Sequence, residues 1–382
     1  MARIVVGVYM VRYPLGGMLS MTLQLAAGLV RLGHDVRVVE KSGWANDCFD
    51  PSRGAMTDDC AYGVRVVGQL LERFGLGEKW CFVDRQGRPH GLGAGQLANA
   101  LAACDAFIDA GTHGAWLEDL GERSVKVLVD GEPGWTQMRW AKQLQNGGSL
   151  PRYDVYFTVG QNVGTAESRI PTVGRQWQHI LYPVVLDEFE PIPPDRAAPF
   201  STVMNWQAHE ELEYEGTVFG QKDVEFERFV ALPSLAAPAR FELAAAGKEL
   251  PRARLEGEGW TVRDAHEATV SYDAYRDFVR RSRGEFSVAK NVFVATNSGW
   301  FGDRSAAYLA AGRPVVLQDT GISAHLPCGE GLFAVADVQE AAAAVREIEG
   351  DYGRHSRAAR ELAREFLAAD RVLPRLLEAI GL

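Results

Sequence analysis

Three basic residues in the second half of the chain lie where they could bind a phosphate group. Lys222 follows a glycine turn, Lys290 follows a predicted strand, and Arg304 lies at the start of a predicted helix. Cations bind phosphate oxygens, and a departing diphosphate gains negative charge as the bond to it breaks. These residues, with Asn205 at the end of another strand, predict a diphosphate site. Alternatively, each lysine is a solvated surface charge, as most lysines are.

The segment that contains Arg304 has the pattern of a helix-strand unit with a ligand at one end. A turn at 298–302 precedes a helix of small residues at 303–311, and a continuously apolar strand follows from residue 314. The helix start offers unpaired N–H groups, and the strand ends at the edge where open α/β sheets bind ligands. The alternative is an ordinary helix-strand unit with a Gly-Arg-Pro stop. The predicted ligand residues here are Ser298, Gly299, Asp303, Arg304, Ser305, Asp319, Thr320 and Gly321.

Two polar turns in the first half also follow predicted strands and could supply a general base. His113 follows strand 106–110, and Asp130 follows strand 125–129, with Glu132 in the same turn. Both turns should lie at the same carboxyl edge of a sheet. A base that accepts the proton of an attacking hydroxyl is typically His, Asp or Glu. The candidate catalytic residues are therefore Asp130 and His113; alternatively, they cap neighbouring helices.

The first 40 residues predict a βαβ unit whose first loop contains a glycine pair. An apolar strand at 3–10, a helix with amphipathic spacing at 19–32 and a second strand at 35–40 follow one another. Gly16 and Gly17 lie between the first strand and the helix, where the absence of side chains lets backbone amides approach a ligand. A plain turn without a ligand is equally compatible with this pattern.

Strands and helices alternate along the whole chain, which predicts an α/β fold with two doubly wound parallel sheets. Further strands are expected at 80–84, 155–159, 179–185, 201–205, 239–244, 260–264, 284–289, 314–318 and 331–336, and further helices at 58–76, 221–231, 271–283, 303–311 and 338–350. The proline-rich segment 186–194 predicts a stiff linker that can form neither helix nor central strand. It should act as a hinge, because few contacts can cross such a connection between two cores. It separates Rossmann-like domains at 1–190 and 196–368 from one another, and a final helix covers 369–382. The ligand cleft should lie between the two domains.

Two stretches of the sequence resemble glycosyltransferases of the GT-B fold. The stretch GLVRLGHDVRVVE at 28–40, after the glycine pair, is similar to their N-terminal half. In their donor-nucleotide half, the pattern E-G-F-G-x-x-x-x-E-A-M-A-x-G-x-P-V-V is matched here by Phe301, Gly302, Gly312 and Pro314. Gly299 and Ala307 stand where that pattern has two glutamates, so the mechanism of the retaining enzymes does not transfer.

The resemblance implies a specific arrangement of domains and ligands. Two Rossmann-like domains would face a central cleft, with a nucleoside-diphosphate sugar bound by the C-terminal domain and an acceptor by the N-terminal domain. The final helix would cross back to the N-terminal domain. Cations and a helix N-terminus would hold the diphosphate, so no metal and no cofactor beyond the sugar nucleotide are expected. The acceptor, the sugar, the nucleobase, the stereochemistry and the oligomeric state stay open.

The composition excludes several classes of function. The 382 residues carry a net charge of -10, which argues against a nucleic-acid or membrane-surface binder. No apolar run approaches the roughly 20 residues that span a bilayer, and the chain enters a strand at once, so we expect neither a transmembrane segment nor a signal peptide. The five cysteines are scattered without a C-x-x-C pair. They fit a reducing compartment such as the cytoplasm and show no zinc pattern.

These observations favour a glycosyltransferase that moves a sugar from a nucleoside diphosphate to an acceptor hydroxyl or other nucleophile. Alternatives on the same scaffold are a nucleotide-sugar epimerase or hydrolase and a non-catalytic nucleotide-sugar binder. A nicotinamide-dependent oxidoreductase is disfavoured, because Gly7, Gly16 and Gly17 do not give the G-x-G-x-x-G spacing after the first strand.

Overall fold

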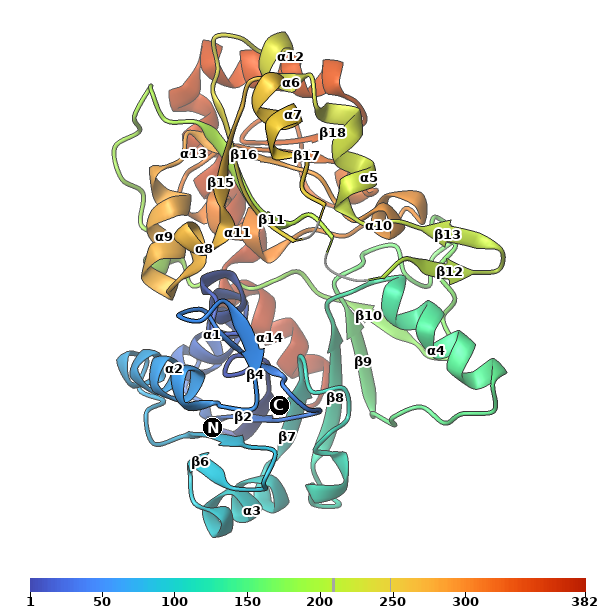
Figure 1. The fold of residues 1–382 in the computed structure, drawn as a ribbon. Helices are drawn as coiled ribbons and strands as arrows, with labels where there is room; N and C mark the ends of the chain where they lie inside the picture. The colour runs from blue at the N-terminus through green and yellow to red at the C-terminus, as the bar shows by residue number, and fades with distance from the viewer. Residues whose placement is uncertain (208–209, 248) are drawn as a thin grey trace.

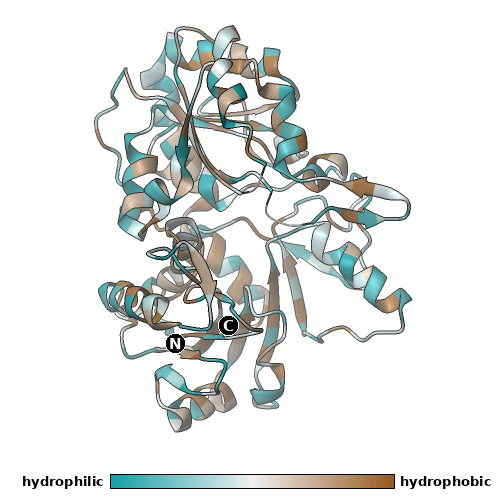
Figure 2. Cartoon of the chain, viewed as in Figure 1, coloured by the Kyte–Doolittle hydropathy of each residue, from teal (hydrophilic) through white to brown (hydrophobic). Residues whose placement is uncertain are grey.

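The chain folds into two α/β lobes, one above the other (Figure 1). The computed structural model describes residues 1–207, 210–247 and 249–382. The lower lobe contains an eight-stranded sheet and the upper lobe a six-stranded sheet. In each lobe, helices cover the sheet, with apolar residues in the strands and polar residues on the outer helices (Figure 2). Among the described residues, no helix has the length and apolar character needed to cross a membrane.

The sheet of the N-terminal lobe has the strand order β10-β9-β8-β7-β1-β2-β5-β6 and is parallel except at its β5/β6 edge. Its strands are β1 (Arg3–Gly7), β2 (Asp35–Lys41), β5 (Trp80–Val83), β6 (Pro89–Gly91), β7 (Ala106–Asp109), β8 (Val125–Asp130), β9 (Val155–Thr158) and β10 (Trp177–His179). The strand expected at 179–185 is wrong, because regular pairing stops at His179 and the chain then leaves this sheet towards the upper lobe.

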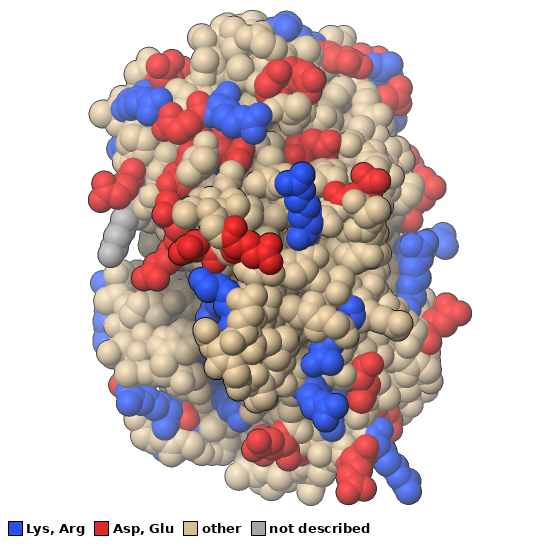
Figure 3. Space-filling model, turned by 90° about the vertical axis from the view of Figure 1, so that its right-hand side faces the viewer, with Lys and Arg blue, Asp and Glu red and all other residues tan. Residues whose placement is uncertain are grey.

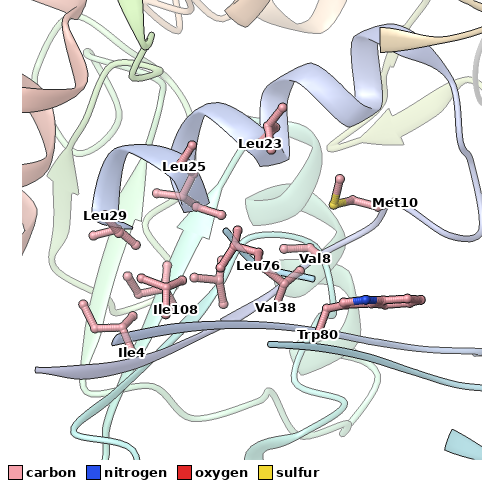
Figure 4. Packing of buried hydrophobic residues seen from close by; sticks show 14 of the residues in the cluster. Ile4, Val8, Met10, Leu23, Leu25, Leu29, Val38, Leu76, Trp80 and Ile108 are labelled. Atoms are coloured by element: carbon pink, nitrogen blue, oxygen red, sulfur yellow. The ribbon is translucent and has the colours of Figure 1, made fainter. Parts of the chain in front are cut away.

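Helix α1 (Gly16–Arg31) forms the core of the N-terminal lobe by packing on the central strands. Leu23, Leu25 and Leu29 lie above Ile4 and Val38 (Figure 4). These apolar residues recur at helical spacing on α1, so one face of the helix is buried. The remaining elements of this lobe are the hairpin β3 (Cys48–Asp50) and β4 (Ala55–Thr57), and the helices α2 (Ala61–Arg73), α3 (Ala94–Ala103) and α4 (Trp135–Gln145).

The sheet of the C-terminal lobe is parallel throughout, with the order β15-β14-β11-β16-β17-β18. Its strands are β11 (Phe200–Asn205), β14 (Phe241–Ala246), β15 (Trp260–Asp264), β16 (Gly284–Ser287), β17 (Val315–Gln318) and β18 (Leu332–Val335). Aromatic rings fill its core, with centroids 4.9 Å apart for Phe226 and Trp260 and 5.4 Å apart for Phe241 and Trp260.

Helices surround this second sheet, and a short hairpin extends from it towards α4 (Figure 1). The hairpin consists of β12 (Leu212–Tyr214) and β13 (Thr217–Phe219). The helices are α5 (Lys222–Phe226), α6 (Leu232–Leu235), α7 (Arg252–Gly257), α8 (Ala265–Thr269), α9 (Tyr272–Arg281), α10 (Asn291–Ala295), α11 (Asp303–Ala310), α12 (Val338–Gly350) and α13 (Tyr352–Leu362).

The chain crosses between the lobes twice, and the two crossings lie side by side. Val184 forms a parallel bridge with Ala368, and after it the final helix α14 (Ala369–Ala379) returns to the N-terminal lobe. There α14 packs on α1, where Gly28 leaves room for Leu373 (Figure 1). The linker was expected to be a hinge with few contacts crossing between the two cores, and this stays a prediction. Arg280, Arg313 and Arg360 donate hydrogen bonds to its carbonyl groups, which attach the linker to the C-terminal lobe.

Candidate functional site

The carboxyl edges of the two sheets face each other, and each sheet reverses its strand order at one point of that edge. In the C-terminal sheet the reversal lies between β11 and β16, and in the N-terminal sheet it lies between β1 and β7. Open α/β sheets bind ligands in the crevice at such points. Lys290 follows β16 and Asn205 ends β11, while the His113 turn follows β7. Of the predicted residues, Asn205, Lys290 and His113 therefore come from the two switch points.

Lys222, Lys290 and Arg304 gather in one site at the C-terminal edge. Lys222 begins α5, Lys290 precedes α10, and Arg304 lies in the first turn of α11. Burial and the neighbouring charges of Arg304 and Lys290 lower the pKa of Lys222 to about 7. The three cations repel one another, and the carboxylates of Glu132, Glu285 and Asp303 balance them, so an anion would bind here in exchange for one of these partners.

Arg304 is held in place by groups of its own lobe. Its Nε donates to Glu285 at 2.6 Å, and its Nη1 donates to the Val203 carbonyl at 2.7 Å. Nη2 has no hydrogen-bond partner among the described residues. Glu285 is completely buried in β16 and neutralises the guanidinium from below. A fixed guanidinium with a free nitrogen is suited to a charge-assisted hydrogen bond with a phosphate oxygen.

An ion pair between the lobes currently satisfies Lys290. Its Nζ contacts the two carboxylate oxygens of Glu132 at 2.7 and 2.6 Å. Glu132 comes from the turn after β8 in the N-terminal lobe, and its side chain is 40% exposed. The Glu132 carboxylate thus faces solvent and neutralises a buried lysine of the other lobe. A bound diphosphate would compete directly with Glu132.

Buried polar atoms without a partner mark the same region. They include the Tyr275 hydroxyl, both amide atoms of Gln221 and one carboxylate oxygen of Glu285. Gln221 precedes Lys222, and the charges of Asp303 and Arg304 act on Tyr275. Buried polar groups in native proteins are normally paired, so each unpaired group needs a reason. A polar ligand in the crevice would give these atoms partners, and none of these three residues was among the predicted site residues. For Glu285 the sequence did carry a signal, because it is an acidic residue inside a predicted buried strand.

Asp303 and Tyr182 complete the site from opposite lobes. Burial raises the pKa of Asp303, and the charges of Arg304 and Lys222 oppose this shift. Burial raises the pKa of Tyr182 well above its usual range, and the nearby charges of Asp303 and Glu132 add to the effect. Tyr182 therefore stays a neutral hydroxyl, beside the carboxylates of Asp303 and Glu132.

Most of the other predicted donor residues join the lobes or shape turns instead. Residues 160–162 of the N-terminal lobe pair with residues 298–300, where the amide of Asn162 donates to the Ser298 carbonyl at 3.0 Å. Gly299 has a φ of +70°, and a Cβ there would lie 2.9 Å from the Asn162 nitrogen. The hydroxyl of Thr320 donates to the Trp300 carbonyl at 2.6 Å. Ser298 and Gly299 are thus covered by the opposite lobe.

The turn after β17 supports this contact between the lobes. Asp319 accepts hydrogen bonds from the Gly321 amide at 2.8 Å and from the Ser323 hydroxyl at 2.6 Å. A Cβ on Gly321 would lie 2.3 Å from the side chain of Asn297. Ser305 is buried within α11, and Asn205 is exposed at the end of β11. Asp319 and Gly321 are half-buried, so Asn205 is the most exposed residue of this group.

The glycine pair of the first loop lies at a helix contact. Gly16 begins α1, and a Cβ on it would lie 2.4 Å from the Tyr275 Cβ and 2.5 Å from the Ser271 carbonyl. Gly17 has more space, with Tyr275 at 3.9 Å. The close approach of α1 to the start of α9 explains why position 16 is glycine, without a ligand.

The two predicted catalytic residues have very different surroundings. Asp130 is buried and accepts four hydrogen bonds, from the Glu132 amide, Thr136, Gln137 and Thr158, at 2.6 to 3.0 Å. These donors hold the turn that presents Glu132, and they leave Asp130 no free oxygen for a substrate. His113 is exposed, and its backbone adopts the left-handed conformation, with a φ of +52°. Only His113 is free to accept a proton.

Stacked aromatic rings cover the N-terminal side of the crevice. Ring centroids lie 5.0 Å apart for Tyr9 and Tyr13, and 6.4 Å apart for Tyr13 and Phe49. His266 of the other lobe continues the stack at 5.3 Å from Phe49. Arg12 lies over the Tyr9 ring at 4.4 Å and is fixed by buried Glu40. Arg12 covers one end of the stack and His266 the other, so the half-buried rings offer their edges rather than free faces to a ligand.

Two facing Rossmann-like lobes, with a cation site at their switch points, define a protein of the GT-B fold class, and solved structures bear out this class over the full length of the chain. An alpha-glucosyltransferase in complex with UDP and DNA matches with a TM-score of 0.59 and 10% identity, over 100% of both chains. HepE from Anabaena, in complex with UDP and glucose, matches with a TM-score of 0.57 and 12% identity, over 100% of both chains. AviGT4, a glycosyltransferase involved in avilamycin A biosynthesis, matches with a TM-score of 0.52 and 13% identity, over 100% of this chain and 97% of that one.

The likeness at these identities concerns the fold. No protein-family model matches the sequence. No curated protein matches it either.

Proposed function

We propose that this protein transfers a sugar from a nucleoside diphosphate to an acceptor in the cleft between the lobes. The observation that carries the proposal is the cation site of Lys222, Lys290 and Arg304 at the switch point of a GT-B fold. Charges fixed before the reaction stabilise the diphosphate as it departs. The UDP found with the alpha-glucosyltransferase and with HepE supports a nucleoside diphosphate as the ligand.

The donor is proposed to bind without a metal ion or another cofactor. Arg304 would bind one phosphate through its free Nη2, and Lys290 would exchange Glu132 for a phosphate oxygen. The Tyr275 hydroxyl and the Gln221 amide, which lack partners in the described structure, would pair with polar groups of the donor. Asp303 would accept a hydrogen bond from a sugar hydroxyl.

The acceptor is proposed to bind along Tyr9, Tyr13 and Phe49 in the N-terminal lobe. His113 lies at the same switch point and would accept the proton of the acceptor hydroxyl. The alpha-glucosyltransferase was solved with DNA, but the net charge of -10 favours an acceptor other than nucleic acid here. Figure 3 shows both signs of charge interspersed around the hollow between the lobes, as expected without a large basic surface. All five cysteines are free thiols, which supports a reaction in the cytoplasm.

The test is a calorimetric titration of the protein with nucleoside diphosphates and their sugar conjugates, beginning with UDP. We expect one site per chain, and Lys290→Gln should weaken binding about tenfold or more, because it removes one charge-assisted hydrogen bond. Lys79→Gln is the matched control, since Lys79 is an exposed lysine paired with Asp35 in the N-terminal lobe. Absence of nucleotide binding, or equal binding by Lys290→Gln, would reject the donor site.

An assay for released nucleoside diphosphate separates transfer from the other reactions of this scaffold. Release that requires an added acceptor supports a transferase. Release at full rate in water identifies a hydrolase, and binding without release identifies a non-catalytic binder.

A further inference from the structure

The N-terminal lobe brings together three metal-binding side chains far from the cation site. We propose that Cys60, Asp84 and His90 bind a zinc ion. Cys60 precedes α2, Asp84 follows β5, and His90 lies in the edge strand β6. Figure 1 places β6 at the bottom of the lower lobe, away from the upper lobe. The thiol, the imidazole and the carboxylate are the ligand types that zinc takes together in proteins.

The spacing of the three ligand atoms fits a tetrahedral zinc ion. With Zn–N and Zn–O distances of about 2.0 Å and a Zn–S distance of about 2.3 Å, tetrahedral edges are about 3.3 Å for N···O and about 3.5 Å for S···N. The structure has 3.0 Å between His90 Nε2 and Asp84 Oδ2 and 3.6 Å between His90 Nε2 and Cys60 Sγ. All three atoms lie within 4.8 Å of one another. The edge between Cys60 Sγ and the Asp84 carboxylate is within 4.8 Å, against about 3.5 Å in a tetrahedral site, so binding would close it by up to about 1.3 Å.

His90 Nε2 lies close to both Asp84 and Cys60. Hydrogen bonds alone do not account for both contacts. His90 Nε2 can donate to Asp84 or accept from Cys60, but it cannot do both. A metal ion on the shared side of the three atoms would take one lone pair from each of them. Binding would release the thiol proton of Cys60 to solvent, so metal affinity should rise with pH.

The carboxylate of Asp84 is already oriented for such a role. Its Oδ1 accepts the backbone N–H groups of Gln86 and Arg88, both at 2.9 Å, which directs Oδ2 towards His90. Partners of this kind fix metal ligands. The Arg88 side chain also donates from Nε to Oδ2 at 2.8 Å, although it is 70% exposed. Arg88 therefore acts as an internal competitor that a metal ion must displace.

There is room for a fourth ligand beside the three side chains. A pocket of about 350 Å³ is lined by Cys60 and His90 together with Asp59, Val64, Arg65 and Arg88. A water molecule in this pocket would complete the tetrahedron. The ion would link the start of α2 to the β5/β6 edge, so its first effect should be on the stability of this lobe.

Cobalt and zinc titrations of the full chain, stripped of metal with a chelator, test the proposal. We expect one Co²⁺ per chain, with the intense d–d bands of a tetrahedral site and a thiolate charge-transfer band, and displacement of Co²⁺ by Zn²⁺. Zn²⁺ should also raise the melting temperature. Cys60→Ser should abolish the charge-transfer band, and His90→Gln should weaken binding by more than about 100-fold, beyond what changes outside the ligand set cause. Cys328→Ser, which alters the exposed thiol, should leave both unchanged.

Arg88→Gln keeps the ligands and removes the competing cation. It should tighten metal binding about two- to fivefold, in keeping with the small effect of an exposed ion pair. Absence of stoichiometric binding in both the original chain and Arg88→Gln would overturn the proposal. So would cobalt binding without a thiolate band, or binding that persists in Cys60→Ser, because the ion would then lie elsewhere.

Discussion

The two carboxyl edges that face the cleft have the same place in their sheets but opposite electrostatic character. At the N-terminal edge, Asp109 and Asp130 are buried carboxylates whose oxygens each accept hydrogen bonds. At the C-terminal edge, the cations of Lys222, Lys290 and Arg304 share little solvent, and polar groups beside them lack partners. At the first edge both aspartates are fully paired, although the buried hydroxyl of Thr112 has no partner. At the second edge Lys290 is paired only with an exposed carboxylate of the other lobe, and several buried polar atoms lack partners.

This difference shows that a polar residue at a strand end is not by itself a ligand residue. Asp130 and Lys290 both lie at or just after the carboxyl end of a parallel strand, so the sequence pattern predicts the same kind of role for both. The number of donors and acceptors around each side chain separates them. A carboxylate with four donors stabilises its own turn. A lysine whose partner is a half-exposed glutamate from the other lobe can exchange that partner.

The largest expected effect is on stability, at the N-terminal edge. Asp130→Ala would leave the buried donors of Thr136, Gln137 and Thr158 unpaired, so unfolding should require about 3–5 kcal/mol less free energy. Chemical denaturation measures this loss. Asp154→Ala, at an exposed site with one backbone hydrogen bond, should cost about 1 kcal/mol or less. A stable Asp130→Ala protein without turnover would instead make Asp130 catalytic and remove the contrast between the edges.

The next effect is on donor binding, at the C-terminal edge. Arg304→Ala should raise the Kd of a nucleoside diphosphate about 10- to 100-fold, because one charge-assisted hydrogen bond is worth roughly 1.5–3 kcal/mol. Since Glu285 would lose its buried partner, Arg304→Lys is needed as a variant that keeps the charge. Arg254→Ala removes an exposed arginine of the same lobe and should change nothing. Unaltered affinity in Arg304→Ala would show that this edge does not bind the diphosphate.

Breaking the Lys290–Glu132 ion pair that joins the two edges should have a smaller effect on donor affinity, and of opposite sign. Glu132→Gln removes the internal competitor of the diphosphate, so donor affinity should increase about two- to tenfold, within the range measured for interfacial charges. The Michaelis constant for donor should fall while turnover changes little. If turnover instead drops by more than about 100-fold with unchanged affinity, Glu132 is a general base rather than a counterion.

The smallest effect is a pH dependence set by Lys222. Its pKa is lowered to about 7, so it is a cation below that pH and neutral above it. Affinity for a sugar nucleotide should therefore be highest near pH 6 and fall by up to about tenfold by pH 8, the value of one pKa unit of coupling. The sugar nucleotide is the better probe, because a terminal phosphate titrates near pH 6 itself. Lys222→Met should bind the sugar nucleotide weakly at both pH values. If its affinity still fell between pH 6 and pH 8, the pH dependence would belong to another group.

Local patterns predicted the elements of the fold closely where burial and periodicity agreed. The strand at 260–264 and the helix at 338–350 have the predicted bounds. Helix α1 begins at Gly16 rather than at residue 19, because both glycines lie in its first turn against α9. The strand expected at 179–185 was an apolar run that pairs in part with the final crossing instead. Apolar composition there reflects burial without specifying a sheet.

The sequence by itself determined the alternation of strands and helices, the GT-B class and the three cations, since these depend on neighbouring residues and on spacing. Only the tertiary structure decided which polar groups are free. It pairs Glu132 with Lys290 across 158 positions, covers Ser298 and Gly299 with residues 160–162, and surrounds Asp130 with donors. It also brings Cys60 to His90 across 30 positions without any sequence motif. Availability for chemistry depends on contacts between distant segments, and local sequence carries no record of them.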